Sequence, residues 1–377
     1  MKKLLNFLLS WTLTVISTST MLACTTNNSH KNNKFENNIN QILNPQILRD
    51  YDQIVVDNHH NLYFTIKKTT ELYSTLYFLA NKTMTPIKLA GLPANIIIND
   101  IKIDHQDNVY VLSNNAGLWK LPAATTAFQH IENVNELDIL SFCFDQNDNV
   151  YFGTASVIGD HGTTYFLEHD SWQVKEINGL SIPINIIKID HLDNVYLAPI
   201  TTINNNGPKA FLLKSGTTAI QAIDDIKTNV NSIAIAPDNN VYFGLGNELY
   251  ISKNHGISTQ KLIEIDGDLR RILVTPNNSV YYEILKDNFT TLYKLDREKH
   301  IYHSDEWWGI NALVSDQTNN LFFASESVFY MITNEQTMQE SFYPHLKNMG
   351  YYINDIINKD DTVYFSNATG IWYYQNN

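Results

Sequence analysis

Aspartate and asparagine recur in short polar clusters along this chain, and they are the residues best suited to chemistry. The clearest cluster is Asp104-His-Gln-Asp-Asn108, and equivalent clusters open at Asp57, Asp145, Asp190 and Asp316. Carboxylate and amide oxygens are the ligands that Ca²⁺ prefers, so each cluster is a candidate cation loop. However, no glutamate completes a coordination shell, and Asp and Asn side chains also accept N–H bonds in tight turns. We therefore predict structural turns and no metal.

A second polar series lies five residues before these turns. It comprises Asp52, Asn99, Leu140, Asn185, Asn231, Arg270 and Asn311, with Asn354 one residue closer to its turn. These side chains could form one site only in a fold that gathers the same position of every repeat. Leu140 and Arg270 interrupt the series, which argues against a single symmetric metal site.

Other catalytic signatures are missing from the sequence. It contains no nucleophile elbow, no HExxH zinc motif, no P-loop and no dinucleotide fingerprint. The two cysteines, Cys24 and Cys143, allow neither a disulfide framework nor a cysteine-based zinc site. Cys143 lies in an alternating stretch and is predicted to be a small buried hydrophobe. These absences favour a binding protein over an enzyme, and we predict no cofactor.

The polar clusters punctuate a repeated hairpin. Between Ile101 and Leu112, one alternating run reaches the cluster and a second alternating run follows it, which is typical of two strands joined by a tight turn. The hairpin occurs eight times, with turns that open at Asp57, Asp104, Asp145, Asp190, Ala236, Thr275, Asp316 and Asn358. The copies are roughly 39 to 47 residues apart, which is the period of a four-stranded propeller blade.

Each hairpin continues into a third strand, such as 116–121 or 369–374, and a fainter fourth strand. We therefore predict an all-β fold, a single β-propeller of eight four-stranded blades. The last blade lacks a fourth strand, and the segment 39–48 is predicted to supply it and close the ring, because an open ring would expose sheet edges. A seven-bladed ring with one divergent hairpin outside it is the alternative.

In such a ring, the second polar series falls where the innermost strands begin, around one mouth of the axis. We predict a ligand-facing rim that contains Asn99, Asn185, Asn231, Arg270, Asn311 and Asn354. In the alternative interpretation, each Asn bonds to backbone groups between adjacent blades.

Longer loops at 155–162 and 203–209 enter the same face, and so does the stretch 305–309. Trp307 and Trp308 are adjacent there and cannot both point into one strand face. One of them is therefore predicted to be an exposed binding anchor. The alternative is that both are wedged between blades.

The repeated pattern N-V-Y-F followed by G-L-W resembles the repeats of two-component-regulator-type and NHL-type propellers. The resemblance covers residues 51–374, but Asp107, Asp148 and Asp193 stand where the family's turn has glycine. It implies a sensor or binding module, although some relatives are lactonase-like hydrolases. A metal-dependent hydrolase would need carboxylates around the channel. The candidates are Asp52, Asp100 and Asp355.

The N-terminus has the features of an export signal. Lys2 and Lys3 precede an apolar run, 4–16, that is too short to span a bilayer. Met21-Leu-Ala-Cys24 resembles a bacterial lipoprotein cleavage site, and the opening of the chain resembles mollicute lipoproteins. The resemblance implies that residues 1–23 are a signal peptide and that Cys24 carries a diacyl anchor. An ordinary secretory signal with a chance cysteine is the alternative.

Residues 24–38 are polar and are predicted to be a flexible tether, with the propeller formed by residues 39–377. The net charge of −13 argues against nucleic acid as a partner. We expect a monomer, lipid-anchored to the outer face of the cell membrane, that binds an extracellular protein or carbohydrate. The alternative function is that of a metal-dependent hydrolase of the lactonase type.

Overall fold

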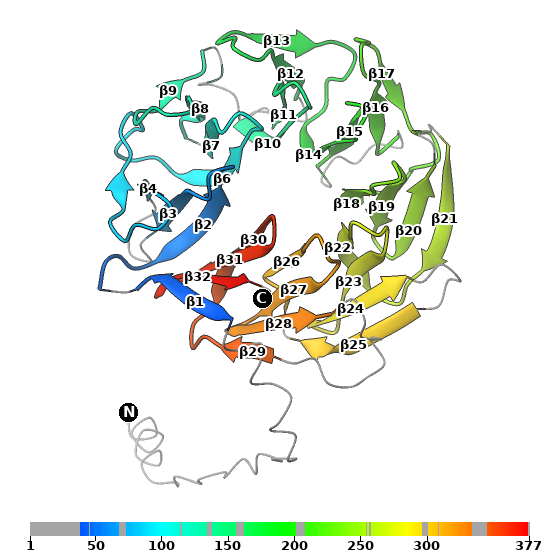
Figure 1. Cartoon of the computed structure of the whole chain (residues 1–377). Helices are drawn as coiled ribbons and strands as arrows, with labels where there is room; N and C mark the ends of the chain where they lie inside the picture. Colours follow the sequence, from blue (N-terminus) through cyan, green and yellow to red (C-terminus); the bar gives the residue numbers. More distant parts are fainter. Residues whose placement is uncertain are drawn as a thin grey trace, which may run out of the picture.

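The computed structural model describes residues 38–44, 46–67, 73–113, 115–132, 134, 138–155, 162–200, 208–253, 255, 258–295, 301–307, 309–333 and 345–375. Within these ranges every regular element is a β-strand, and the strands form eight antiparallel sheets of four. The sheets surround a central axis like the blades of a propeller (Figure 1). No helix in these ranges is long and apolar enough to cross a membrane. The predicted eight-bladed all-β propeller is confirmed.

Blades 1 to 4 each consist of four consecutive strands, ordered from the axis outward. Blade 1 has β2 (Tyr51–Val56), β3 (Leu62–Lys67), β4 (Ser74–Leu79) and β5 (Ile87–Lys88). Blade 2 has β6 (Ile98–Ile103), β7 (Val109–Ser113), β8 (Gly117–Leu121) and β9 (Gln129–His130). Blade 3 has β10 (Asp138–Phe144), β11 (Val150–Ala155), β12 (Thr164–Leu167) and β13 (Val174–Ile177). Blade 4 has β14 (Ile184–Ile189), β15 (Val195–Pro199), β16 (Phe211–Leu213) and β17 (Ile220–Ala222).

Blades 5 to 7 follow the same order, and blade 8 draws its outer strand from the start of the propeller. Blade 5 has β18 (Val230–Ile235), β19 (Val241–Leu245), β20 (Glu248–Ser252) and β21 (Thr259–Glu264). Blade 6 has β22 (Asp268–Val274), β23 (Val280–Lys286), β24 (Phe289–Leu295) and β25 (Ile301–Trp307). Blade 7 has β26 (Ala312–Ser315), β27 (Leu321–Ser325), β28 (Val328–Ile332) and β29 (His345–Asn348). Blade 8 has β30 (Ile353–Lys359), β31 (Thr362–Asn367), β32 (Gly370–Gln375) and β1 (Ile39–Leu43).

The first turn of each blade explains why Asp and Asn recur together. In blade 2, one carboxylate oxygen of Asp104 accepts bonds from the backbone N–H groups of Gln106 and Asn108, at 3.0 and 2.8 Å. The other oxygen accepts a 2.7 Å bond from the Asn108 side-chain amide, whose own oxygen accepts the Ala123 N–H of the next turn. The same Asp–Asn pairing occurs at Asp57, Asp145, Asp190 and Asp316. The repeated Asp–Asn pair therefore holds the first and second turns of one blade together.

The fourth residue of this turn links neighbouring blades. Asp107, Asp148 and Asp193 have φ values of 65°, 60° and 61°, a backbone region in which glycine is usual. Oδ1 of Asp148 accepts a 2.9 Å bond from the backbone N–H of His105 in the preceding blade. Asp107 and Asp193 accept the equivalent bond. Glycine could not make this bond, so the hydrogen bond offsets a backbone strain of about 1 kcal/mol.

The ring is closed by the N-terminal strand, as predicted. β1 pairs with β32 in blade 8, where Ile39 lies opposite Tyr374 and Leu43 opposite Ile371. Figure 1 shows the strands from the two ends of the propeller side by side. Leu43 is fully buried and Ile39 is nearly so. The seven-bladed alternative is therefore not what the chain adopts.

Hydrophobic side chains fill the space between blades rather than one central core. For example, the rings of Phe329 in blade 7 and Phe365 in blade 8 stack with centroids 4.3 Å apart. Burying one such ring contributes about 1.5–3 kcal/mol. Cys143 differs from expectation, because Phe142 takes the fully buried position and Cys143, on the other side of the strand, is only half-buried. Desolvation of the Cys143 thiol still raises its pKa to about 12.

Candidate binding sites

The predicted rim residues share one structural feature. Each lies at a β-bulge near the start of an innermost strand, where two residues oppose one on the neighbouring strand. Asn311 stands just outside β26 in the same arrangement, with its N–H on the carbonyl of Ala324. Bulges bend the strand and aim side chains away from the ladder. The structure therefore does place the series at equivalent positions around the axis.

Three of these asparagines form hydrogen bonds to the next blade. The side-chain amides of Asn231, Asn311 and Asn354 donate to the backbone carbonyls of Leu269, Ile353 and Tyr51, at 3.0, 3.3 and 2.6 Å. Each acceptor is the residue just before the bulge of the following blade. These are the hydrogen bonds that the alternative interpretation predicts, in which each asparagine bonds to backbone groups between adjacent blades.

Arg270 and Asn185 have different surroundings. The guanidinium of Arg270 forms a 3.1 Å ion pair with Asp268 in its own blade. Oδ1 of Asn185 is buried without a hydrogen-bond partner, and the backbone carbonyl of Asn99 accepts a bond from Gln53. Ligand binding at these positions stays a prediction. Cys24 and Trp308 lie outside the described residues, as do most of the two longer loops, and Trp307 is placed by its backbone in β25.

The three carboxylates considered for a hydrolase occupy blades 8, 1 and 2 near the axis. Desolvation, and then repulsion from Asp52 and Asp100, raises the pKa of Asp355 to about 6. One Asp355 oxygen accepts the N–H of Ile54 at 3.0 Å, and Asp100 forms a 3.0 Å ion pair with Lys102. Asp52 and Asp100 thus help to raise the pKa of Asp355, while Asp355 and Asp100 already have partners within the protein.

Two other groups of titratable side chains lie close enough together to share a cation. They consist of Asp57, His59 and Asp107, and of Asp104, Asp148 and His169, among the described residues. Both belong to the turns described above, where backbone and amide donors already occupy the carboxylate oxygens. These hydrogen bonds position the carboxylates of both groups, whereas Nδ1 of His169 is buried without a hydrogen-bond partner.

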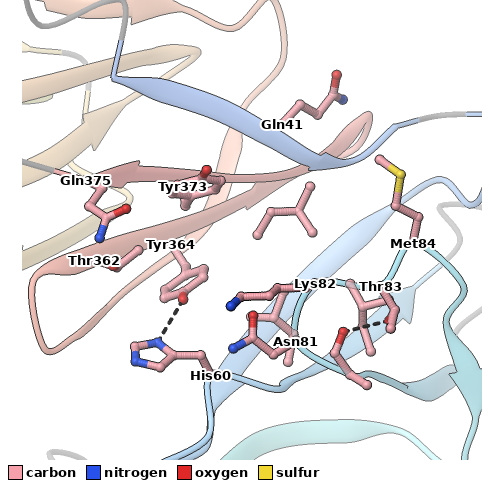
Figure 2. Close-up of a pocket in the computed structure, with 14 residues that line it drawn as sticks. Gln41, His60, Asn81, Lys82, Thr83, Met84, Thr362, Tyr364, Tyr373 and Gln375 are labelled. Carbon is pink, nitrogen blue, oxygen red and sulfur yellow. Dashed lines mark hydrogen bonds between the residues drawn. The ribbon is translucent and has the colours of Figure 1, made fainter. Parts of the chain in front are cut away.

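A pocket of about 550 Å³ lies between blade 8 and blade 1, on the face that carries the Asp–Asn turns. We call the junction of these two blades the closure seam and the cavity the seam pocket. Its walls are apolar in one part, with Ile42, Leu62 and Leu79, and the rings of Tyr364 and Tyr373 (Figure 2). Its polar groups are Gln41, His60, Asn81, Lys82, Thr83, Thr362 and Gln375. A 3.1 Å hydrogen bond joins Nδ1 of His60 to the Tyr364 hydroxyl across the seam. Pockets of this size and mixture suit a small organic ligand.

Sequence reasoning missed this pocket, which lies on the face opposite the predicted rim. The closure prediction already placed the segment 39–48 beside the last blade, so the seam itself could have been foreseen. The turn that contains Lys82 carries no motif of its own, however, and nothing in the sequence indicates that it reaches across the seam.

A second pocket of about 540 Å³ lies between blades 5 and 6, on the face of the predicted rim. The rings of Tyr282 and Tyr293 stack at its wall, with centroids 5.3 Å apart. Lys286 pairs with Asp266 at its edge, and Glu264 and Asp287 give its lining a net negative charge.

The comparisons with known proteins agree with the fold. No family model matches the chain, and no curated protein does. Among solved structures, a streptogramin B lyase is 14% identical, with a TM-score of 0.54 over 90% of this chain and 97% of that one. The Dos1 propeller is 11% identical, with a TM-score of 0.68 over 89% and 94%. YCF48 bound to a D1 peptide is 12% identical, with a TM-score of 0.51 over 76% and 94%.

The chain therefore has the β-propeller fold that these solved structures share. At these identities the likeness concerns the fold alone, because one propeller fold serves many unrelated functions.

Proposed function

We propose that this chain is a lipid-anchored cell-surface β-propeller that binds an extracellular ligand or protein partner. The observation that carries the binding part is the preformed pocket at the closure seam, in which apolar walls and polar side chains of blades 8 and 1 surround one cavity. A propeller neighbour, YCF48, has been captured with a peptide, which is consistent with binding as a use of this fold.

The anchoring part of the proposal rests on Met21-Leu-Ala-Cys24 and the apolar run before it. Two acyl chains on Cys24 give stable membrane attachment, since each buried CH₂ contributes about 0.8 kcal/mol. Labelling cells with radioactive palmitate tests it. We expect label on the wild-type chain and none on Cys24→Ala, and equal labelling of both would contradict the anchor.

The binding part is tested with the full chain, purified in mild detergent and applied to glycan and peptide arrays. The pocket variant is Thr83→Trp, which places an indole in the pocket. Its matched control is Thr125→Trp, because both threonine hydroxyls donate a 2.6 Å bond to the first carbonyl of the equivalent turn. We expect array signals that Thr83→Trp abolishes and Thr125→Trp preserves. Signals unaffected by either variant would place binding elsewhere, and no signal would contradict the proposal.

A metal-dependent hydrolase is the second candidate, favoured by the buried carboxyl of Asp355, whose pKa burial and the nearby carboxylates Asp52 and Asp100 raise. A divalent cation among these carboxylates would favour their charged forms. Elemental analysis of the purified chain, with Asp355→Asn as control, tests it alongside a lactone-hydrolysis assay. Stoichiometric metal lost in the variant, together with turnover, would replace the binding proposal.

A further inference from the structure

Lys82 occupies an unusual backbone position in the turn that forms one wall of the seam pocket. In this turn the N–H of Thr83 bonds to the carbonyl of Ala80, and Lys82 has a φ of 60°. The equivalent residues of blades 2, 3 and 4 are Ala124, Asp170 and Gly216, with φ values of 59°, 62° and 72°. A non-glycine residue in this region costs about 1 kcal/mol. Blade 1 therefore has a long cationic side chain at a site that glycine would satisfy better.

The Lys82 side chain extends across the pocket toward His60 and Tyr364 (Figure 2). Its ammonium group has no ion pair or hydrogen bond with any residue that the structure describes. The residues that line the pocket include no carboxylate. An unpaired cation in a protein of net charge −13 leaves a local site for a negative group.

The other titratable groups of the pocket add no further free charge. Nε2 of His60 already lies 3.4 Å from the carboxylate of Asp360. Tyr364 stays neutral because burial raises its pKa to about 12. The pocket thus offers one unpaired positive charge, on an exposed lysine, and this charge matches a monoanion.

Beside this charge the pocket is apolar. Met84 lies at its edge with 63% of its surface exposed, and Leu62 and Leu79 form the floor. An exposed methionine next to buried leucines provides adaptable apolar surface. A ligand that fills the pocket therefore needs an apolar body as well as its charge.

Building on the proposed binding function, we propose that the seam pocket binds a carboxylate attached to an apolar body, with the carboxylate on the Lys82 ammonium group. The body packs against Leu62, Leu79 and Met84. The carboxylate belongs either to a free organic acid or to the C-terminus of a peptide, and the two sources share this chemistry.

The same geometry couples the ligand to ring closure. Gln41 and Ile42 come from β1, whereas Tyr364 and Tyr373 come from β31 and β32. A ligand in the pocket contacts the last blade, its closing strand and the first blade together. Because it binds only the closed ring, it raises the melting temperature by mass action.

Isothermal titration of the full chain in mild detergent tests the proposal with three probes. They are N-acetyl-Leu-Phe with a free carboxylate, the same dipeptide as its C-terminal amide, and 4-phenylbutyrate. We expect the acid to bind at least about 10-fold more tightly than the amide, the loss expected for one charge-assisted hydrogen bond. Binding of the peptide acid alone identifies a peptide terminus, and binding of both acids identifies apolar carboxylates in general.

The matched variants are Lys82→Met, which removes the charge, and Lys88→Met, which removes an exposed lysine of β5 outside the pocket. Lys82→Gly serves as a second variant that folds without the backbone strain. We expect both Lys82 variants to lose about 10- to 100-fold in affinity for the acid and its melting-temperature shift, with Lys88→Met unchanged. Three results would overturn this inference: equal affinity for acid and amide, wild-type affinity of Lys82→Met for the acid, or no binding by any probe. Array signals blocked by Thr83→Trp would still support the broader binding function in that case.

Discussion

The seam between blades 2 and 3 and the seam between blades 8 and 1 are built from the same repeat but are held differently. In the first, the chain passes directly from one blade to the next, and the turns are joined by the bonds from His105 to Asp148. In the second, the chain passes from β1, the outer strand of blade 8, into β2 of blade 1, but no chain connection joins β1 to β32 within blade 8. There the carbonyl of Ala368 accepts the N–H of Asp50, and Asn354 bonds to Tyr51. Strand β1 adds a full ladder, so noncovalent bonds do at closure what chain connectivity does elsewhere.

The closure seam is also where the pocket lies. The closing strand β1 therefore has two roles. It satisfies the edge of blade 8, and it supplies part of a cavity wall that the repeat alone would not produce.

Removing the closing strand is expected to have the largest effect on this comparison. A chain that begins at residue 44 lacks the buried side chains of Ile39 and Leu43, each worth about 1.5–3 kcal/mol, and exposes the edge of β32. We expect the free energy of unfolding to fall by at least about 4 kcal/mol, measured by urea denaturation, with aggregation on heating. The control begins at residue 38 and keeps β1. Equal stability of the two chains would mean that the ladder contributes nothing to closure.

The internal seam is tested at Asp148, which is buried and has a φ of 60°. Asp148→Ala loses the bond to the His105 N–H and keeps the backbone strain, so we expect a loss of about 2–3 kcal/mol. Asp148→Gly loses the bond but relieves the strain, and it should cost about 1 kcal/mol less than the alanine variant. Thermal denaturation of both variants provides the measurement. Should the glycine variant be the less stable of the two, the explanation for aspartate at this position is wrong.

The sequence was sufficient for the architecture because the signals that set it are local. Alternation gives the strands, and Asp104 and Asn108 lie in the same turn that they stabilise. The use of Asp148 could not be foreseen, because its partner His105 is 43 residues away and the pairing depends on how blades pack. For Asn354, whose acceptor is 303 residues earlier in the chain, the sequence offered a bond between adjacent blades as one of two interpretations but could not choose between them. Position in the repeat was predictable, and the direction of each side chain was not.

A pH-dependent effect is expected at the closure seam through Asp355. Its pKa of about 6 in the folded chain exceeds the value of about 4 in the unfolded chain. The unfolded chain therefore gives up this proton first, and stability falls as the pH rises from about 4 to 6 and stays reduced above that. Asp355→Asn keeps an acceptor for the Ile54 N–H and removes the buried charge.

We expect Asp355→Asn to be more stable than wild type by about 1–2 kcal/mol at pH 7.5, with no difference near pH 4. The partial solvent exposure of Asp355 places the gain below the full value of the pKa shift. Urea denaturation at the two pH values measures it. A gain that is the same at both would show that packing, and not the charge, is responsible.

The smallest expected effect compares equivalent asparagines at the closure seam and at an internal seam. Asn354 bonds across the closure seam at 2.6 Å, whereas Asn311 bonds from blade 7 to blade 8 at 3.3 Å. Asn354→Ala should cost about 1–1.5 kcal/mol and Asn311→Ala about 0.5 kcal/mol. The shorter bond has the better geometry, and blade 8 is linked to blade 1 only through β1, which is held to β32 by noncovalent bonds. In the chain that begins at residue 44, where the ring is already loosened, Asn354→Ala should cost less than in the intact chain, while Asn311→Ala should cost the same. Additive losses at both positions would indicate that the asparagine bond and the closing strand act independently, and that closure is a sum of separate contacts rather than one cooperative unit.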